Sequence, residues 1–320
     1  AWKTAAPALA LLGLTLAYGT HRAEPESGSE RREGAGIDVA VVQGNLDLGT
    51  QWSSDLYGRN LDAYLRASLE AIRTSRPDLI VWPESAMTFF LEREPAYQLS
   101  IASVLEQGGA QLIAGGPHVI DDAETRFHNS AMLVDADGRV IDRYDKELLL
   151  PFAEYQPFRW LDLMNRDFGQ VREFLPGAER PPLRAVGGPA GVMICNEALF
   201  PEIARARTLA GAAYLVTLTN DTWIDSETFA QISFDMAIVR AVEQRRFLVR
   251  ASTSGPSAIV APDGSVLAQS AAFVRAVLAG RIEPREDLTL YARAGDLFAR
   301  TCAATALLAL MLARRRRGAA

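Results

Sequence analysis

Three residues of different chemical type each follow an apolar, strand-like segment of the chain: Glu84, Lys146 and Cys195. A carboxylate can take up a proton, a thiolate can attack a carbonyl carbon, and an ammonium can stabilise the negative oxygen that then forms. Each residue alone also has an ordinary structural explanation. Glu84 could cap a helix, Cys195 could be a small buried apolar side chain, and Lys146 could be an exposed surface residue. In combination they are the parts needed for acyl transfer through a thioester.

Lys146 is also unusual in the composition of the chain. Of the 33 lysines and arginines, Lys3 and Lys146 are the lysines. Arginine stays protonated near neutral pH, whereas a partly buried lysine can have its pKa lowered and donate a proton, or can lie beside a negative intermediate. Lys3 precedes an apolar run and needs no special chemistry, so Lys146 is the lysine that we consider for catalysis.

The elements that must position these side chains alternate between strands and helices. Apolar runs predict strands at 37–42, 79–82, 111–115, 131–134, 139–144, 191–195, 213–218 and 257–260, and helical spacing predicts helices at 61–72, 99–106, 201–210 and 229–245. Turn residues at 135–138 and 261–264 predict reversals of the chain. The pattern indicates a layered α/β domain from about residue 37 to residue 283.

Composition narrows the classes of function. A chain of 320 residues with 49% hydrophobic and 22% charged residues can bury a large core. Its net charge of −6, without basic residues interleaved with aromatic ones, argues against nucleic-acid binding. Cys195 and Cys302 lie in different surroundings, so we expect free thiols rather than a disulfide. The histidines, His21, His118 and His128, lack the spacing of metal ligands, and we expect structural or solvated side chains.

The two ends of the chain are apolar and suggest a membrane. Residues 4–20 carry no charge, and residues 301–313 are followed by four arginines at 314–317. Both runs are shorter than the roughly 20 residues of a typical spanning helix, so a buried helix, an interfacial helix and, at the N-terminus, a signal peptide remain alternatives. Flanking cations place the folded part on the non-cytoplasmic side. The polar stretch 24–36 is typical of a linker.

The segments around the three candidate residues resemble a known family. Trp82-Pro83-Glu84-Ser85, Lys146 and the run 191–197, which contains Cys195, occur in the order of the Glu-Lys-Cys triad of the carbon–nitrogen hydrolase (nitrilase) superfamily. Within it, segments 144–157, 219–223 and 291–293 are similar to the apolipoprotein N-acyltransferases. The resemblance implies a nitrilase-like α-β-β-α sandwich at 37–290, flanked by short membrane helices at 1–23 and 296–320 and joined to the first by the linker 24–36.

The resemblance also implies roles for single residues. Glu84 would be the general base, Lys146 would stabilise the oxyanion and Cys195 would carry the acyl group, while Glu154 matches a second essential glutamate and Glu197 a further acidic position. An ordinary surface carboxylate is the alternative for Glu154. The implied reaction moves a phospholipid acyl chain to the thiol and then to the amine of diacylglyceryl-cysteine on an apolipoprotein, and it uses no metal or organic cofactor. Such an enzyme would lie in the bacterial inner membrane, with its catalytic domain on the periplasmic face.

The sequence departs from the family pattern at three places. Asn196 stands where tyrosine is usual, and segment 223–228 lacks the expected glycine-rich features. The multi-helix membrane portion that precedes the domain in the family is missing, so we expect either a fragment or a reduced relative. A nitrilase-type amidase that uses water as the acceptor, or a catalytically silent membrane-anchored binding domain, are the alternative functions. Apolar residues 89–91, after Glu84, could line an acyl entrance or belong to the core.

Overall fold

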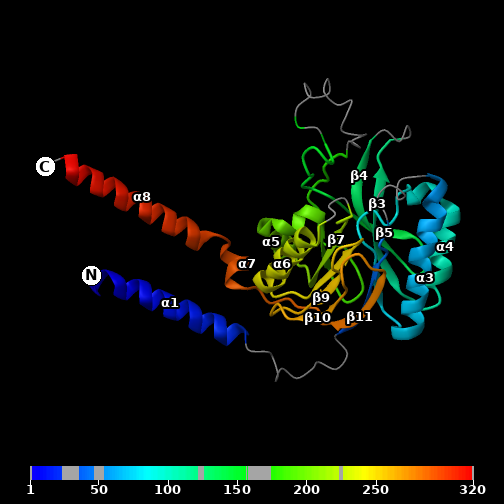
Figure 1. The fold of residues 1–320 in the computed structure, drawn as a ribbon, viewed down its shortest axis with the longest axis horizontal. Coiled ribbons are helices and arrows are strands. Elements are labelled where there is room, and N and C mark those ends of the chain that lie inside the picture. Colours follow the sequence, from blue (N-terminus) through cyan, green and yellow to red (C-terminus); the bar gives the residue numbers. More distant parts are fainter. Residues whose placement is uncertain are drawn as a thin grey trace.

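Two β-sheets pack face to face between two layers of helices. The computed structural model describes residues 2–23, 36–46, 54–121, 126–155, 157, 174–222 and 226–318. Helices α3 (Tyr57–Ser75) and α4 (Pro95–Leu105) cover one sheet, and α5 (Pro201–Leu209) and α6 (Glu227–Gln244) cover the other, on the opposite side of the molecule (Figure 1). The predicted α-β-β-α sandwich is therefore confirmed.

The first sheet has the order β11-β1-β2-β3-β4-β5. Its strands are β1 (Ile37–Gln43), β2 (Leu79–Val81), β3 (Gln111–Val119), β4 (Phe127–Val134), β5 (Val140–Asp145) and β11 (Ala276–Ile282). The central strands β1, β2 and β3 run parallel, and β4, β5 and β11 add antiparallel edges. The predicted reversal at 135–138 joins β4 to β5, with the Gly138 N–H bonded to the Asp135 carbonyl.

The second sheet has the order β10-β9-β8-β7-β6. Its strands are β6 (Ala190–Ile194), β7 (Tyr214–Thr219), β8 (Leu248–Ser252), β9 (Ala258–Val260) and β10 (Val266–Gln269). Strands β6, β7 and β8 are parallel, which places the ends of β6 and β7 side by side. Strands β8, β10 and β11 were not predicted from the sequence, whereas the other strands lie within a few residues of their predicted positions.

The core is divided by the two sheets. Side chains such as Val41, Val81, Ile194 and Val216 fill the space between the sheets. Leu61 and Ile101 pack from the first pair of helices onto the outer face of one sheet, and Phe234 packs from α6 onto the other. Parallel strands covered on both faces are expected as nearly continuous apolar runs, which explains why β1 and β7 were recognisable in the sequence. The short helices η1 (Ser54–Leu56), η2 (Leu91–Arg93), η4 (Cys195–Leu199) and α7 (Leu290–Ala294) connect these layers.

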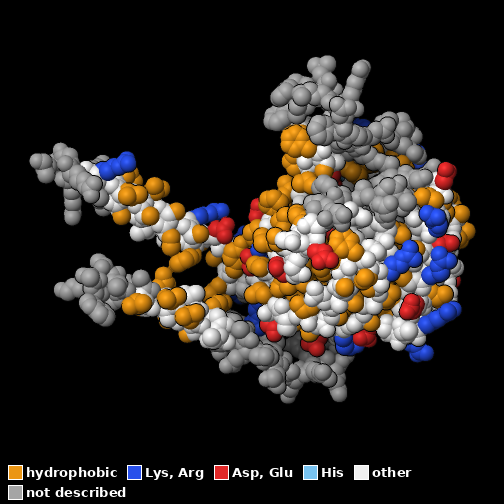
Figure 2. Space-filling model, viewed as in Figure 1, with side chains coloured by type: hydrophobic (Ala, Val, Ile, Leu, Met, Phe, Trp, Pro, Cys, Tyr) orange, Lys and Arg blue, Asp and Glu red, His pale blue; other side chains and the backbone are white. Residues whose placement is uncertain are grey.

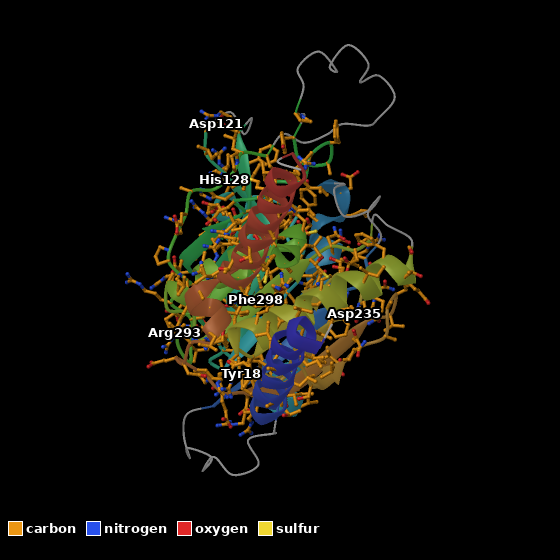
Figure 3. The ribbon with its side chains drawn as sticks, turned by 90° about the vertical axis from the view of Figure 1, so that its left-hand side faces the viewer. Tyr18, Asp121, His128, Asp235, Arg293 and Phe298 are labelled. Atoms are coloured by element: carbon orange, nitrogen blue, oxygen red, sulfur yellow. The ribbon has the colours of Figure 1, made fainter. Side chains whose placement is uncertain are left out.

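Two terminal helices, α1 (Trp2–Ala23) and α8 (Leu297–Gly318), project from the same side of the sandwich (Figures 1 and 2). Their apolar side chains are exposed, with Leu14 at 69% and Leu307 at 60% of full exposure, so the alternative of buried helices is wrong for the described residues. Seen from this side, α8 and α1 stand in front of α6, which carries Asp235 (Figure 3). Within the described part of the chain, no helix combines the length and apolarity needed to cross a membrane. The predicted linker lies outside the described residues except for Gly36.

Candidate active site

The structure brings Glu84, Lys146 and Cys195 together where strands of both sheets end. Glu84 follows β2, Lys146 follows β5 directly and Cys195 follows β6 directly. Ser85, the residue after Glu84, has a φ of 56°, and Cys195 itself has a φ of 55°, so the chain turns sharply in the left-handed region at both positions. Such strained turns after strands are common where a reactive side chain must face away from its sheet. They direct residues of separate strands into one cluster.

Cys195 is a half-buried, free thiol at the first residue of η4. Its thiol lies close enough to Glu84 and Thr219 for both side chains to influence its ionisation. Burial and the nearby negative charge of Glu84 raise the pKa of the Cys195 thiol to about 12, although Lys146 acts in the opposite direction. The resting side chain is therefore a neutral thiol, and it needs a base before it can attack a carbonyl.

Glu84 is placed to be that base. Its side chain is 8% exposed, and each of its oxygens accepts a hydrogen bond: Oε1 from Nδ2 of Asn129 at 2.7 Å and Oε2 from the backbone N–H of Asn220 at 2.9 Å. Burial raises the pKa of Glu84 above its ordinary value, Glu154 raises it further, and Lys146 and Asn129 oppose the shift. A buried carboxylate with a raised pKa, close to the thiol, has the position and basicity required to accept the proton.

Lys146 is a buried ammonium between two carboxylates. It is 1% exposed, and its Nζ lies 2.8 Å from Oε2 of Glu154 and 3.7 Å from Oε1 of Glu84. Burial alone would lower the pKa of Lys146, but the charges of Glu84 and Glu154 outweigh burial and raise it. The suggestion of a lysine with a lowered pKa that donates a proton is therefore wrong. Lys146 supplies a fixed positive charge, which is what a developing oxyanion requires.

Glu154 belongs to the same cluster, and the alternative of an ordinary surface carboxylate is wrong because its residue is 7% exposed. Besides Lys146, it accepts hydrogen bonds from Asn129 Nδ2 at 2.8 Å and from the Leu150 N–H at 2.8 Å. These contacts fix the carboxylate that is paired with Lys146.

Glu197 is fully buried, but its contacts differ from those of Glu154. Its Oε1 accepts from the Tyr144 hydroxyl at 2.8 Å and from the backbone N–H groups of residues 147 and 148 at 2.8 and 3.0 Å. Its Oε2 accepts from the Ile194 N–H at 2.7 Å. Burial raises the pKa of this carboxyl, while these donors lower it. Glu197 thus ties the segment after Lys146 to the turn that carries Cys195.

Asn129 of β4 is a site residue that the sequence did not reveal. Its one amide group donates to both Glu84 and Glu154, so it fixes the spacing of the two carboxylates around Lys146. It is 5% exposed, in a strand whose following residues are apolar. The available signal was a polar run, His128 to Ser130, at the start of that apolar segment, and such a run has many ordinary explanations.

Asn196, next to the nucleophile position, is anchored on one side. Its Nδ2 donates to the Leu148 carbonyl at 3.2 Å. Its Oδ1 is buried and has no hydrogen-bond partner within the described part of the chain. Residues 223–225 of the departing segment lie outside the described residues.

The apolar residues 89–91, which follow Glu84, lie partly in the core and partly at the surface. Phe89 and Leu91 are buried in the core under α3 and α4, in agreement with the simpler of the two predictions. Phe90 is partly exposed and lies edge-on to Phe127, which in turn contacts Phe174, with ring centroids 6.0 and 5.0 Å apart.

The histidines form contacts unrelated to the Cys195 cluster. Nδ1 of His118 lies 2.6 Å from Oε1 of Glu92, and the rings of His118 and His128 are stacked with centroids 6.4 Å apart. Across the described ranges, no group of three or more histidine, cysteine, aspartate or glutamate side chains is arranged to hold a metal ion. The side chain of His21 is outside the described part.

Comparisons with known proteins agree with this geometry. A family model described as carbon–nitrogen hydrolase matches residues 38–289. Proteins named apolipoprotein N-acyltransferase are similar to the chain: that of Geobacter metallireducens is 36% identical over 97% of this chain, and that of Bradyrhizobium diazoefficiens is 33% identical over 99%. The chain spans 59% and 60% of the length of these two relatives.

Solved structures with the same fold are also known. A mutant form of an amidase of the nitrilase superfamily from Nesterenkonia AN1 superposes with a TM-score of 0.61 over 83% of this chain and 96% of that chain. At 20% sequence identity, this likeness concerns the fold alone.

Proposed function

The chain belongs to the carbon–nitrogen hydrolase family, and we propose that it moves a phospholipid acyl chain, through a thioester on Cys195, to the N-terminal amine of diacylglyceryl-cysteine lipoproteins. The observation that carries the proposal is the gathering of Glu84, Lys146 and Cys195 in one buried cluster, in which Glu154 is paired with Lys146. Relatives named apolipoprotein N-acyltransferase support the choice of substrates.

In the first half of the proposed reaction, Glu84 accepts the proton of the thiol as Sγ of Cys195 attacks the ester carbonyl carbon of a phospholipid. The carbonyl oxygen becomes an oxyanion beside Nζ of Lys146, whose charge is fixed by Glu154. The C–O bond to the glycerol then breaks, and the leaving alkoxide takes the proton back from Glu84. The products are a lysophospholipid and an acyl thioester on Cys195.

In the second half, the neutral amine of the diacylglyceryl-cysteine attacks the thioester carbon. Lys146 again lies beside the oxyanion, and the C–S bond breaks to release the sulfur of Cys195. The amine gives up one proton to Glu84, which returns it to the sulfur and restores the carboxylate and the thiol of the resting site. The residues of this chain thereby carry a proton in both directions without a cofactor.

We propose further that the domain is attached to the extracytoplasmic face of the bacterial inner membrane through α1 and α8. Both helices expose leucine side chains and leave the domain on one side (Figure 2). Helix α6 faces that side (Figure 3) and carries an apolar stripe at helical spacing. The stripe consists of Phe229, Ile232, Met236, Val239 and Val242, which are 38 to 55% exposed.

Mass spectrometry of the intact chain after incubation with phospholipid vesicles tests the proposed chemistry. We expect an added acyl mass on the peptide that contains Cys195, its removal by hydroxylamine, and its transfer to a diacylated lipopeptide added in a chase. Cys195→Ala should abolish the adduct. Cys302→Ala is the matched control and should retain it, because Cys302 is an exposed thiol of α8 without acidic or basic partners of the Cys195 kind.

Two other results would replace the proposal. Ammonia release from simple amides, with no acyl adduct from lipid, would identify a nitrilase-type amidase. A chain that forms neither product would be a catalytically silent binding domain. For the membrane attachment, vesicle flotation should carry the chain upward, and recovery of the chain in the detergent-free soluble fraction would contradict it.

A further inference from the structure

Phe152 is exposed on the turn that carries Glu154. The residue is 56% exposed, and its backbone has a φ of 65°, in the left-handed region. Two backbone hydrogen bonds close the turn: the Phe152 N–H donates to the Tyr155 carbonyl at 2.9 Å, and the Glu154 N–H donates to the Leu150 carbonyl at 2.9 Å. The turn therefore leaves Phe152 at the surface, while Glu154, two residues later, is buried.

The stability of the fold does not account for a phenylalanine at this position. A left-handed φ is rare for a bulky side chain, and glycine or asparagine adopts it at lower cost. An exposed ring also buries little apolar surface, so packing does not offset that cost. Arg76 has a φ of 46°, but there the left-handed residue closes the end of helix α3. A strained residue beside a reactive cluster calls for a functional explanation.

The same turn connects Phe152 to Lys146. Oε2 of Glu154 accepts from the Leu150 N–H at 2.8 Å and lies 2.8 Å from Nζ of Lys146. In the proposed reaction, the carbonyl oxygen of the acyl group lies beside this ammonium. The acyl chain begins at the carbon that carries this oxygen, so its methylene groups must pass close to Lys146 as they leave the cluster.

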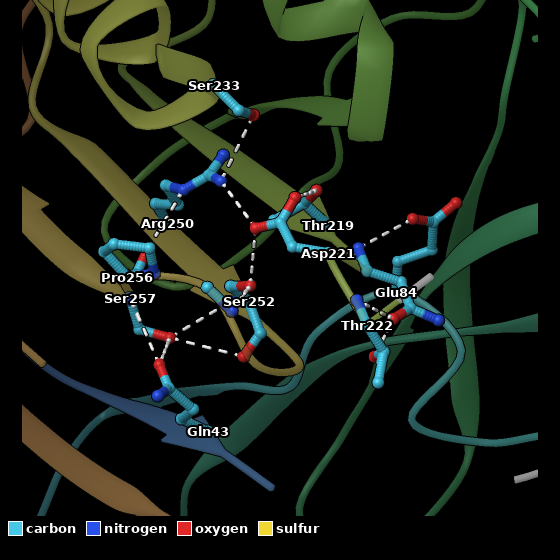
Figure 4. A network of polar contacts seen from close by, with 12 residues as sticks. Gln43, Glu84, Thr219, Asp221, Thr222, Ser233, Arg250, Ser252, Pro256 and Ser257 are labelled. Atoms are coloured by element: carbon cyan, nitrogen blue, oxygen red, sulfur yellow. Dashed lines mark hydrogen bonds and ion pairs between the residues drawn. The ribbon is translucent and has the colours of Figure 1, made fainter. Parts of the chain in front are cut away.

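On the side of β7 and β8, buried polar groups close the cluster to an apolar chain. Asp221, Arg250 and Ser252 are 0 to 2% exposed. Arg250 and Ser252 both donate to the Asp221 carboxylate, at 3.0 and 2.9 Å (Figure 4). Asp221 directly follows Asn220, whose N–H donates to Glu84 at 2.9 Å. An apolar chain here would separate charged groups from their partners, which is costly, so we expect the chain to leave elsewhere.

Beside the turn of Phe152, by contrast, the neighbouring side chains are apolar. The Phe174 N–H donates to the Glu154 carbonyl at 2.9 Å, and the ring of Phe174 lies edge-on to that of Phe127, with centroids 5.0 Å apart. Phe127 lies two residues before Asn129 on β4, so both side chains are on the same face of the strand. Asn129 donates to both carboxylates of the cluster, so apolar groups begin where the cluster ends.

We propose that Phe152 binds the acyl chain of the lipid donor, and that its exposed ring packs against the methylene groups where they leave the Lys146 cluster. This inference deepens the proposed acyl transfer and rests on it. The left-handed backbone at Phe152 is then a consequence of two demands on one short turn. The turn must present an aromatic ring at its outer end and keep Glu154 paired with Lys146 at its inner end.

A contact of this kind predicts a preference for long acyl chains. Each methylene group that moves from water onto an apolar surface favours binding by a similar amount, and a contact with about two such groups corresponds to roughly a tenfold preference. A very short acyl chain does not reach the ring. Loss of the ring should therefore change the ratio of long-chain to short-chain acylation, whereas loss of a structural support would lower both rates alike.

Competition between two donors measures this ratio. The full chain in detergent receives an equimolar mixture of two phospholipids with the same headgroup, one with butyryl and one with palmitoyl chains. Mass spectrometry after a short incubation compares the two adducts on Cys195. We expect the ratio of palmitoyl to butyryl adduct to fall by about tenfold in Phe152→Gly and in Phe152→Asn. Phe152→Leu keeps an apolar side chain, and its ratio should stay within about twofold of the wild-type value.

Urea unfolding separates binding from support of the fold. Glycine and asparagine adopt a left-handed φ more readily than phenylalanine, so the unfolding midpoints of Phe152→Gly and Phe152→Asn should lie at or above that of the wild-type chain. Arg76→Gly is the matched control, because it relieves the same kind of backbone strain at the end of α3. Its midpoint should rise, and its adduct ratio should equal that of the wild-type chain.

Each contrary result has a distinct meaning. An unchanged adduct ratio in Phe152→Gly, or a lower unfolding midpoint in that variant, would overturn the binding role. An equal loss of both adducts, together with weaker flotation on vesicles, would make Phe152 a membrane anchor instead. Absence of both adducts in the wild-type chain would overturn the acyltransferase proposal, and this inference with it, so the two failures are distinguishable.

Discussion

The ammonium of Lys146 lies closer to Glu154 than to the proposed base Glu84: Nζ is 2.8 Å from Oε2 of Glu154 and 3.7 Å from Oε1 of Glu84. Glu154 therefore makes the direct ion pair with Lys146, and the charge of Glu84 adds to it from the longer distance. Glu84 is left to interact with the thiol and with Asn129. This division allows one cluster to contain both a fixed cation and a carboxylate that exchanges a proton.

Replacing Glu154 with glutamine should shift the acid limb of acylation to lower pH. Glu84 must be ionised to accept the thiol proton, and its pKa is raised above the ordinary 4.5 by burial and by Glu154. Glu154→Gln removes that repulsion and leaves Lys146 free to favour the Glu84 carboxylate, so both changes lower the pKa of Glu84. We expect the acidic limb of the pH profile of the single-turnover acylation rate to move to lower pH by about one unit. An upward shift would contradict the assigned geometry.

Replacing Lys146 with arginine should abolish most of the acylation even though the charge remains. The side chain is 1% exposed, and a planar guanidinium needs more room than the compact ammonium held between two carboxylates. Loss of an oxyanion donor typically lowers rates by about 100-fold or more. Arg139→Lys, at a side chain that is 78% exposed, is the matched control and should leave the rate unchanged. Near-normal acylation by Lys146→Arg would remove Lys146 from the mechanism.

Much of the fold was predictable because the buried parallel strands are short apolar runs. β8 was not, since its sequence, Leu248-Val249-Arg250-Ala251-Ser252, places a charged residue in the middle of the strand. That arginine is buried by pairing with Asp221, 29 residues earlier, and no local pattern reveals such a partner. β11 was missed because Gly280 and Arg281 interrupt its apolar run at the edge of the first sheet.

The candidate site was predictable in its residue types but not in its electrostatics. Glu84, Lys146 and Cys195 could be selected because reactive types follow strands, and their catalytic roles stay predictions. The direction of the Lys146 pKa depends on two carboxylates from separate segments, and the paired contacts of Asn129 join positions 45 and 25 residues away. Such relations exist only after the sheets are assembled.

Replacing Glu197 with glutamine should destabilise the fold and impair acylation. Four donors converge on this buried carboxylate, and either orientation of an amide turns its NH₂ group toward one of them. We expect the free energy of unfolding to fall by about 3 kcal/mol. Urea unfolding measures this, and the midpoint should drop while the slope stays constant. Glu70→Gln, on the exposed face of α3, is the control. An equal loss of unfolding free energy in that variant would mean that the four hydrogen bonds of Glu197 are not the cause.

Replacing Gly115 with alanine tests whether the turn that carries Glu84 depends on the backbone of β3. A Cβ at Gly115 would lie 2.6 Å from both the Cα of Glu84 and the Pro83 carbonyl oxygen, and backbone atoms cannot rotate away as a side chain can. The turn must shift, so we expect a loss of about 2 kcal/mol in stability. Because the position of Glu84 determines proton transfer from the thiol, acylation of Cys195 should also fall by at least about tenfold.

Gly58→Ala, where the nearest atom would lie 3.7 Å away, is the matched control and should be neutral or slightly stabilising. Wild-type stability together with a wild-type acylation rate in Gly115→Ala would mean that the close approach of β3 does not hold Glu84 in place.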